Sequence, residues 1–224
     1  MAVLTWDQTG ERYYEAGVKN GVLYVQKSDG TYDVGVAWNG LTSVTESREG
    51  GEQNDQYADD IQYISITTNE KFGGTIEAFT YPDEFQACDG EVELTDGMVV
   101  GQQHRSAFGF CYRTSIGNDT EDLEHGYKIH VVYNAKAQPT EKAYETINDS
   151  PEAMTFSWEF TTTPVEIGTV NGIEVKPAAH IELDSRKLSE GKMKAATDLL
   201  YGTANADPTL PTVAQLYAAI AAAT

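Results

Sequence analysis

The segment Met154-Thr155-Phe156-Ser157-Trp158-Glu159-Phe160-Thr161 alternates large apolar side chains with polar ones. Successive side chains of a β-strand point to opposite faces of the sheet, so this alternation predicts a strand with one buried face. Pro164 marks the end of the strand, because proline has no backbone N–H to offer a neighbour. Since aromatic side chains favour strands, the segment predicts a β-rich fold with an aromatic core.

Two further segments repeat this period of two. Residues 108–112 place Phe108, Phe110 and Tyr112 on one face, and residues 127–133 place apolar side chains at every second position. Each is expected to bury one face of a strand. Residues 61–68 and 74–81 complete the expected strands of the central region.

The N-terminal region alternates strand and turn signals. Residues 12–18 and 22–26 flank Lys19-Asn20-Gly21, and Asn-Gly readily adopts positive φ, so we expect a hairpin there. A second turn at Ser28-Asp29-Gly30 leads into an expected strand over residues 32–38. This pattern predicts an antiparallel meander.

Residues 45–60 interrupt the strand pattern. The segment carries six acidic residues against Arg48, which gives a net charge of -5. A loop of this length without apolar periodicity is uncommon in a compact domain and is usually functional or disordered. A functional loop and a solvated insertion both remain open.

The C-terminal region changes character. Residues 188–201 are expected to form a helix, and a second, Ala-rich helix follows Thr212, a residue type that caps helices. The expected fold is mainly β, an antiparallel β-sandwich or barrel with one or two helices, mainly near the C-terminus. We expect one β-sandwich domain over residues 1–184, including the long loop 45–60. Residues 185–224 would form a helical extension packed on the same domain.

The net charge of -20 limits the classes of partner. Affinity for nucleic acid comes from Lys and Arg that displace counterions from phosphates, so direct nucleic-acid binding is disfavoured. A polybasic membrane contact is disfavoured for the same lack of positive charge. The charge fits either simple solubility or a surface that repels a polyanion.

No constellation in the sequence points to catalysis. GxSxG, P-loop and GxGxxG motifs are absent, and acids are too abundant for any glycosidase pair to stand out. Cys88 and Cys111 have no metal-ligand spacing, and no base is specified beside Cys111. The four histidines are scattered along the sequence, at His104, His125, His130 and His180. A structural role is expected for His130. We therefore expect no enzyme, no cofactor and no metal, with a carbohydrate-binding β-sandwich as the alternative class.

Several blocks in order, over about residues 40 to 215, resemble the major tail protein, or tail tube protein, of siphophages that infect Gram-positive bacteria. The blocks are residues 46–52, 57–63, 74–85, 101–103, 108–114, 126–134, 156–164, 200–203 and 210–211.

The resemblance implies a structural virion protein of the tail tube, made and assembled in the host cytoplasm, with another β-rich virion protein as the alternative. Its copies would form hexameric rings that stack into a tube, and DNA would pass through the lumen without specific binding. Tape measure, tail terminator and baseplate proteins are the implied partners, with no cofactor and no active site.

Within this picture, the loop 45–60 is expected to reach a neighbouring subunit or ring. The residues expected to make that contact are Glu46, Arg48, Glu49, Glu52, Asp59 and Asp60. Charge alone suggests their basic partners, which are Arg186, Lys187, Lys192 and Lys194.

Overall fold

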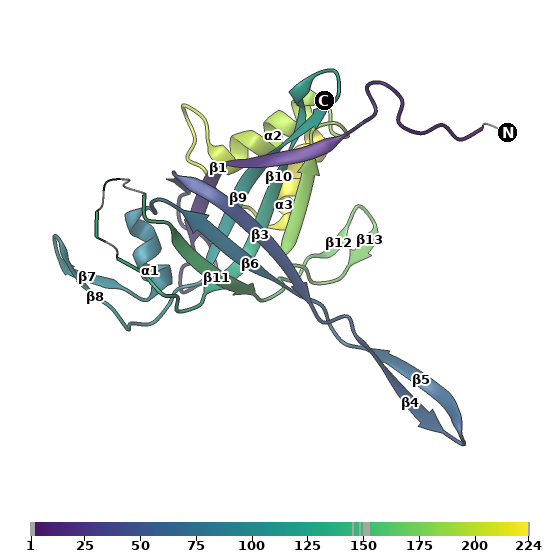
Figure 1. Ribbon diagram of the computed structural model, residues 1–224, viewed down its shortest axis with the longest axis horizontal. Coiled ribbons are helices and arrows are strands. Elements are labelled where there is room, and N and C mark those ends of the chain that lie inside the picture. The colour runs from purple at the N-terminus through teal and green to yellow at the C-terminus, as the bar shows by residue number, and fades with distance from the viewer. Residues whose placement is uncertain (1–2, 145, 148, 150–152, 224) are drawn as a thin grey trace.

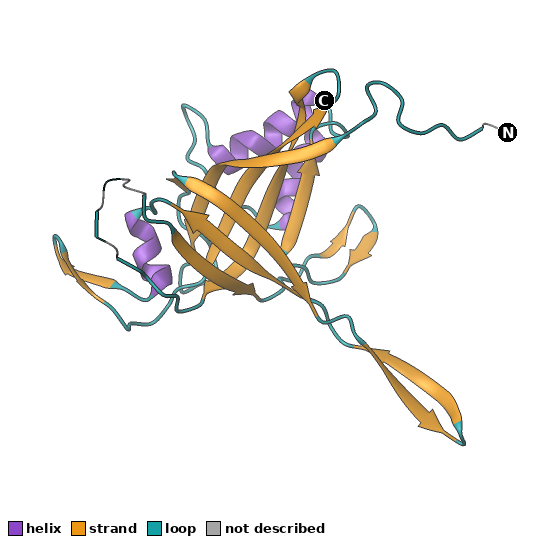
Figure 2. Ribbon diagram, viewed as in Figure 1, coloured by secondary structure: helices purple, strands orange, loops and turns teal. Residues whose placement is uncertain are grey.

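The computed structural model describes residues 3–144, 146–147, 149 and 153–223. It is a mainly antiparallel β protein with two helices near the C-terminus, which confirms the expected fold class (Figures 1 and 2). None of the helices in the described part of the chain combines the length and the apolar character that a membrane-spanning helix requires.

One large antiparallel sheet organises the molecule. Its strands follow the order β2-β1-β9-β10-β11-β6-β3, and β14 also pairs with β10. Their bounds are β1 (Tyr14–Val25), β2 (Val36–Trp38), β3 (Leu41–Glu49), β6 (Lys71–Ala78), β9 (Phe108–Asn118), β10 (Asp122–Ala137), β11 (Phe156–Thr162) and β14 (His180–Asp184).

Strand β10 changes partner along one of its edges. Residues 128–132 pair with β14, whereas residues 135–137 pair with β11. Between them, Asn134 has a φ of 48° and the register with β9 shifts. Such a bulge bends a strand and increases its twist. The sheet therefore divides after Val132, and β11, β6 and β3 fold over β1, β9 and β10 as a second layer.

The first hydrophobic core fills the space between these layers. Trp158 on β11 is 1% exposed, and its ring lies 5.6 Å from Trp38, 5.1 Å from Phe85 and 5.2 Å from Tyr81 between centroids. Phe108 and other aromatic residues of β9 enter the same core. The aromatic core expected from the sequence is thus formed by side chains of both layers.

A second core covers the opposite face of β1, β9, β10 and β14. It is closed by α2 (Glu190–Tyr201) and α3 (Val213–Ala222), whose N-caps are Ser189 and Thr212. Cys111 and Val131 meet Met193 and Leu200 in this core. The expectation of one buried face for the strands at 108–112 and 127–133 was therefore wrong, because the helices bury the second face.

The prediction of a hairpin at Lys19-Asn20-Gly21 was also wrong, because β1 continues through these residues as one strand. Its register with β9 shifts between Ala16 and Lys19 and again between Lys19 and Val22. Asn20 takes a φ of 55° within this irregularity. The positive φ that favours a hairpin turn serves a β-bulge here.

Three hairpins among the described residues lie outside the large sheet: β4 (Gln53–Ala58) with β5 (Ile61–Thr67), β7 (Val92–Thr95) with β8 (Met98–Val100), and β12 (Gly168–Val170) with β13 (Ile173–Val175). The helical turn η1 (Asp83–Phe85) and the short helix α1 (Gln86–Asp89) pack against the body instead, because Phe85 and Cys88 belong to the first core. Figure 1 shows the β4–β5 hairpin extending far from the body.

Trp158→Ala is expected to lower the free energy of unfolding by about 3–5 kcal/mol, because it opens a cavity among packed aromatic rings. Tyr57→Ala, on the β4–β5 hairpin where Tyr57 is 72% exposed, is the matched control and should change stability by less than about 0.5 kcal/mol. Urea unfolding followed by tryptophan fluorescence and circular dichroism measures both. Equal losses in the two variants would contradict this account of the core.

Candidate functional site

The arm, residues 50–70, is formed by β4 and β5 and is exposed along its whole length. Residues 45–49 belong to β3 and residues 53–58 to β4, so the prediction of an irregular loop over 45–60 was wrong. The segment lacks strand-like apolar periodicity because β4 buries neither face. Gly50 and Gly51, with φ of 87° and 70°, let the chain leave the body at the root of the arm.

The arm presents apolar side chains to solvent. All residues of β5 are exposed, with Ile61 at 61% and Tyr63 at 73% on one face of the strand. Ile64 and Ile66, on the opposite face, are 50% and 53% exposed. An isolated two-stranded hairpin is only marginally stable in water. Contiguous exposed apolar residues of this kind mark a surface that contacts another molecule.

The acidic residues predicted to make contacts fall in two different environments. Glu49, Glu52, Asp59 and Asp60 are exposed, the last two in the turn at the tip of the arm with φ of 53° and 62°. Arg48 faces Glu70 across the root of the arm, with 3.8 Å between Nε and Oε1. These positions leave the side chains accessible to a second subunit, and their contacts with it stay a prediction.

Glu46 points inward instead, into the histidine cluster of Glu46, Tyr112, His130 and His180. The Tyr112 hydroxyl donates to Glu46 Oε1 at 2.6 Å, and His130 Nδ1 lies 3.1 Å from the same oxygen. The hydrogen bond with His130 and that from Tyr112 lower the pKa of Glu46 to about 2, against the opposing effect of burial. Glu46 is thus engaged within its own subunit.

The histidine cluster was missed at the level of sequence. His130 lies on β10 and His180 begins β14, and the pairing of these strands places them on diagonal positions. Glu46 comes from β3, which lies at the far end of the strand order. No spacing in the sequence relates these three positions, because only the folding of the two layers brings β3 over β10.

The basic residues predicted as partners lie at the start of the helical extension. Arg186 donates from Nη2 to Asp184 Oδ2 at 2.7 Å, and Lys194 Nζ lies 2.5 Å from Asp198 Oδ2. Within the described ranges, Lys187 and Lys192 form no ion pair. Lys187 and Lys192 are therefore the side chains of this group left available to a partner.

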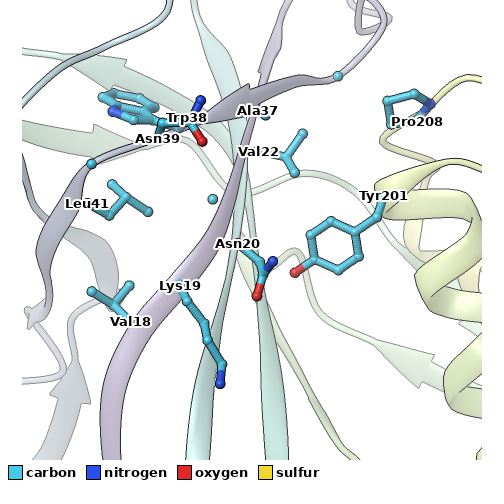
Figure 3. Close-up of a pocket in the computed structure, with 13 residues that line it drawn as sticks. Val18, Lys19, Asn20, Val22, Ala37, Trp38, Asn39, Leu41, Tyr201 and Pro208 are labelled. Atoms are coloured by element: carbon cyan, nitrogen blue, oxygen red, sulfur yellow. The ribbon is translucent and has the colours of Figure 1, made fainter.

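A cavity of about 500 Å³ lies between β1, β2 and the end of α2 (Figure 3). Its lining, within the part of the chain that the structure describes, includes Lys19 but no carboxylate or histidine. Trp38 is 3% exposed and donates its indole N–H to the Thr80 carbonyl oxygen at 3.0 Å. The cavity therefore brings Lys19 and Tyr201 together without a carboxylate or a histidine among its described lining residues, and its Trp38 ring is buried.

The two thiols are equally unsuited to chemistry. Burial raises the pKa of Cys88 and of Cys111 to about 12. The thiolate is the nucleophilic form, so both groups are protonated and inert at neutral pH.

The likenesses found among solved structures include two weak ones to contractile injection systems and related particles. One is to a chain of the anti-feeding prophage baseplate, with 8% identity over 82% of this chain and 97% of that chain and a TM-score of 0.34. The other is to a chain of the sheath–tube complex of an extracellular contractile injection system in its extended state, with 13% identity over 73% and 88% and a TM-score of 0.30. No protein-family model and no curated protein sequence matches the chain. Likenesses at this level assign neither a family nor a function.

Asp184→Asn is expected to lower the free energy of unfolding by about 1–3 kcal/mol at neutral pH, because it weakens the charged hydrogen bonds that join β14 to the segment before α2. The Arg186 guanidinium, opposed by burial, holds the pKa of Asp184 below its ordinary value of 3.8. The stabilisation is therefore complete above that value and is lost as the pH falls through the lowered pKa.

Urea unfolding of both proteins at neutral pH and near pH 3 measures this effect, and the gap between them should narrow in acid. A gap of equal size at both pH values would contradict the assignment. Asp198→Asn, which breaks only the exposed pair with Lys194, is the control and should cost less than about 1 kcal/mol.

Proposed function

We propose that this protein is the structural subunit of a phage tail tube, which polymerises as stacked hexameric rings. The observation that carries the proposal is the arm, an ordered hairpin whose apolar side chains find no partner within the described subunit. The sequence blocks that resemble siphophage tail tube proteins support the same assignment and supply the hexameric ring.

Ring formation is supported by the free edges of the sheet. Among the described residues, β3 pairs only with β6, and β14 pairs only with β10. Open edges expose backbone N–H and C=O groups that can pair with another chain. Pairing of one edge with a different edge on the next copy is a heterologous contact, and such contacts close into rings when the rotation allows it. A continuous barrel around a lumen would result.

Stacking of rings is the role we assign to the arm. Because β5 carries apolar side chains on both faces, a groove or a gap between two subunits would bury it better than a flat surface. The exposed acids Asp59 and Asp60 at its tip would meet basic side chains, with Lys187 and Lys192 of another copy as the candidates. A hairpin that pairs on assembly would gain the burial that it lacks in the free subunit.

Charge favours passage of DNA over binding of DNA. If six copies form a ring, as the resemblance implies, that ring carries 6 × -20 = -120 formal charges. A basic lumen would retain DNA through counterion release, whereas an acidic one lets it slide. Repulsion between subunits is screened over about 8 Å at physiological salt. Apolar contacts such as those of the arm must overcome the remainder.

Within the virion the tube would contact the tape measure protein inside it and the terminator and baseplate proteins at its ends. Negative-stain electron microscopy of the concentrated protein tests the proposal. Rings or hollow striated tubes are expected. A protein that stays monomeric at high concentration and salt, and that binds glycans instead, would overturn it.

Ile61→Ser combined with Tyr63→Ser should impair assembly without unfolding the subunit. Burial of one large apolar side chain contributes about 1.5–3 kcal/mol, and about 1.4 kcal/mol corresponds to a factor of ten, so the critical concentration should rise about tenfold or more. Sedimentation of assembled material over a concentration series measures it.

Ile173→Ser is the matched control, because Ile173 is 63% exposed on the β12–β13 hairpin, close to the 61% of Ile61. It should assemble like the unmodified protein if the arm makes the contact. Normal critical concentrations for the arm variant, with an unchanged urea midpoint, would remove the arm from the interface.

A further inference from the structure

The histidine cluster brings three potential metal ligands together. Glu46 Oε1 lies 3.1 Å from His130 Nδ1 and 3.3 Å from His180 Nε2, and the two nitrogens are 3.4 Å apart. A tetrahedral ion with bonds of about 2.0–2.2 Å to nitrogen and oxygen places its ligands about 3.3–3.6 Å from one another. The three atoms therefore form a triangle close to one face of such a tetrahedron.

The surroundings of His130 leave Nδ1 available as a ligand. Its Nε2 lies 3.1 Å from Thr114 Oγ1, and the Thr114 hydroxyl donates to Glu15 Oε1 at 2.6 Å. The Thr114 oxygen can then only accept from His130, so it satisfies the Nε2–H of the ring, and a bound metal ion would replace the proton through which Nδ1 hydrogen-bonds Glu46. Histidine ligands of metal ions characteristically donate their second ring N–H to such an outer partner.

Neighbouring rings fix the orientation of both imidazoles. Tyr112 stacks on His130 with 4.7 Å between centroids and 4° between planes, and Phe72 stacks on His180 with 4.7 Å and 2°. The centroids of His130 and His180 are 5.6 Å apart, so with nitrogens 3.4 Å apart the two rings meet through their nitrogen edges. The two ring nitrogens thus face each other beside Glu46 Oε1 and are held there by packing.

Charge around the cluster favours a cation. Glu15, Glu46 and Glu182 lie around His130 and Lys128, and Lys128 Nζ bonds Glu15 at 2.9 Å and Glu182 at 3.1 Å. Three carboxylates against one ammonium leave a net charge of -2. The nearby Arg48 opposes a cation, but it is 62% exposed and paired with Glu70.

A surface cavity borders the cluster at His180, one of the three proposed ligands. A cavity of about 280 Å³ is lined by His180, Phe72, Arg48, Glu70 and Pro177, among other residues. The side chains of His130 and His180 are 8% and 11% exposed, and that of Glu46 is 28% exposed. The ligands are therefore shielded yet connected to solvent.

We propose that Glu46, His130 and His180 bind one divalent transition-metal ion, Zn²⁺ by the chemistry of the ligands, in a site with an open fourth position. Two imidazoles with one carboxylate select zinc and its neighbours over Mg²⁺ and Ca²⁺, which prefer oxygen ligands. The ion would clip β3, at the root of the arm, to β10 and β14 of the other layer. This inference stands on the single subunit and does not depend on tube formation.

The competing account of the cluster is a metal-free network in which protons link the three atoms. Titration of chelator-treated, dialysed protein with Zn²⁺ in a calorimeter separates the two. We expect one ion per chain and an increase in the thermal midpoint with zinc concentration, since a ligand that binds only the folded state stabilises it. A titration curve that shows only several weak sites, as expected for surface carboxylates, would overturn the proposal.

Variants locate the site. His180→Ala should abolish the single tight site, and Thr114→Val, which removes the outer partner of His130, should weaken it by about 10–100-fold. Glu46→Gln retains the size of the side chain and a neutral acceptor oxygen, so it provides a folded test if His180→Ala does not fold.

His104→Ala is the control, because His104 lies exposed outside the cluster and should leave binding unchanged. Zinc binding of unmodified strength in both His180→Ala and Glu46→Gln would refute the site. Loss of binding in His104→Ala would place it elsewhere.

Discussion

The change of partner along β10 is the constraint on which the rest of the structure depends. At Asn134 the strand bulges, and its edge passes from β14 to β11. Three hydrogen bonds to two residues hold the bulge: the Asn134 backbone N–H donates to the Tyr32 hydroxyl, its side chain donates to the Thr163 carbonyl, and its carbonyl accepts from the Thr163 N–H. Because the sheet divides here, one layer can fold over the other and still leave a face for the helices. The aromatic core, the helical core and the histidine cluster all follow from that division.

Local patterns predicted the elements that obey local rules. The alternation in residues 154–161 marked β11, and Thr212 marked the start of α3, where its side chain and that of Gln215 form a capping box. Both signals depend only on neighbours in the sequence. The fold class followed because several such signals agreed.

The features that sequence missed depend on partners far along the chain or outside it. Small residues on β9, such as Gly109 and Cys111, gave no sign that α2 and α3 would cover a second face. The arm lacks a buried face, so no periodicity within the subunit could reveal β4. The sequence placed Glu46 in a predicted acidic loop. In the structure it lies on β3, which pairs with β6, and its side chain contacts His130. Of the predicted contact residues, those on the arm are free to act between subunits, and Glu46 is committed within one.

The two cysteines have a consequence for the durability of the molecule outside a cell. Cys88 belongs to the core between the sheet layers, and Cys111 belongs to the core beneath the helices. Both are fully buried, in separate cores, and both thiols stay protonated, so they can neither form a disulfide with each other nor react readily with oxidants. The covalent structure of the folded protein is therefore expected to be the same in a reducing cytoplasm and in an oxidising environment, with no redox partner needed to maintain it.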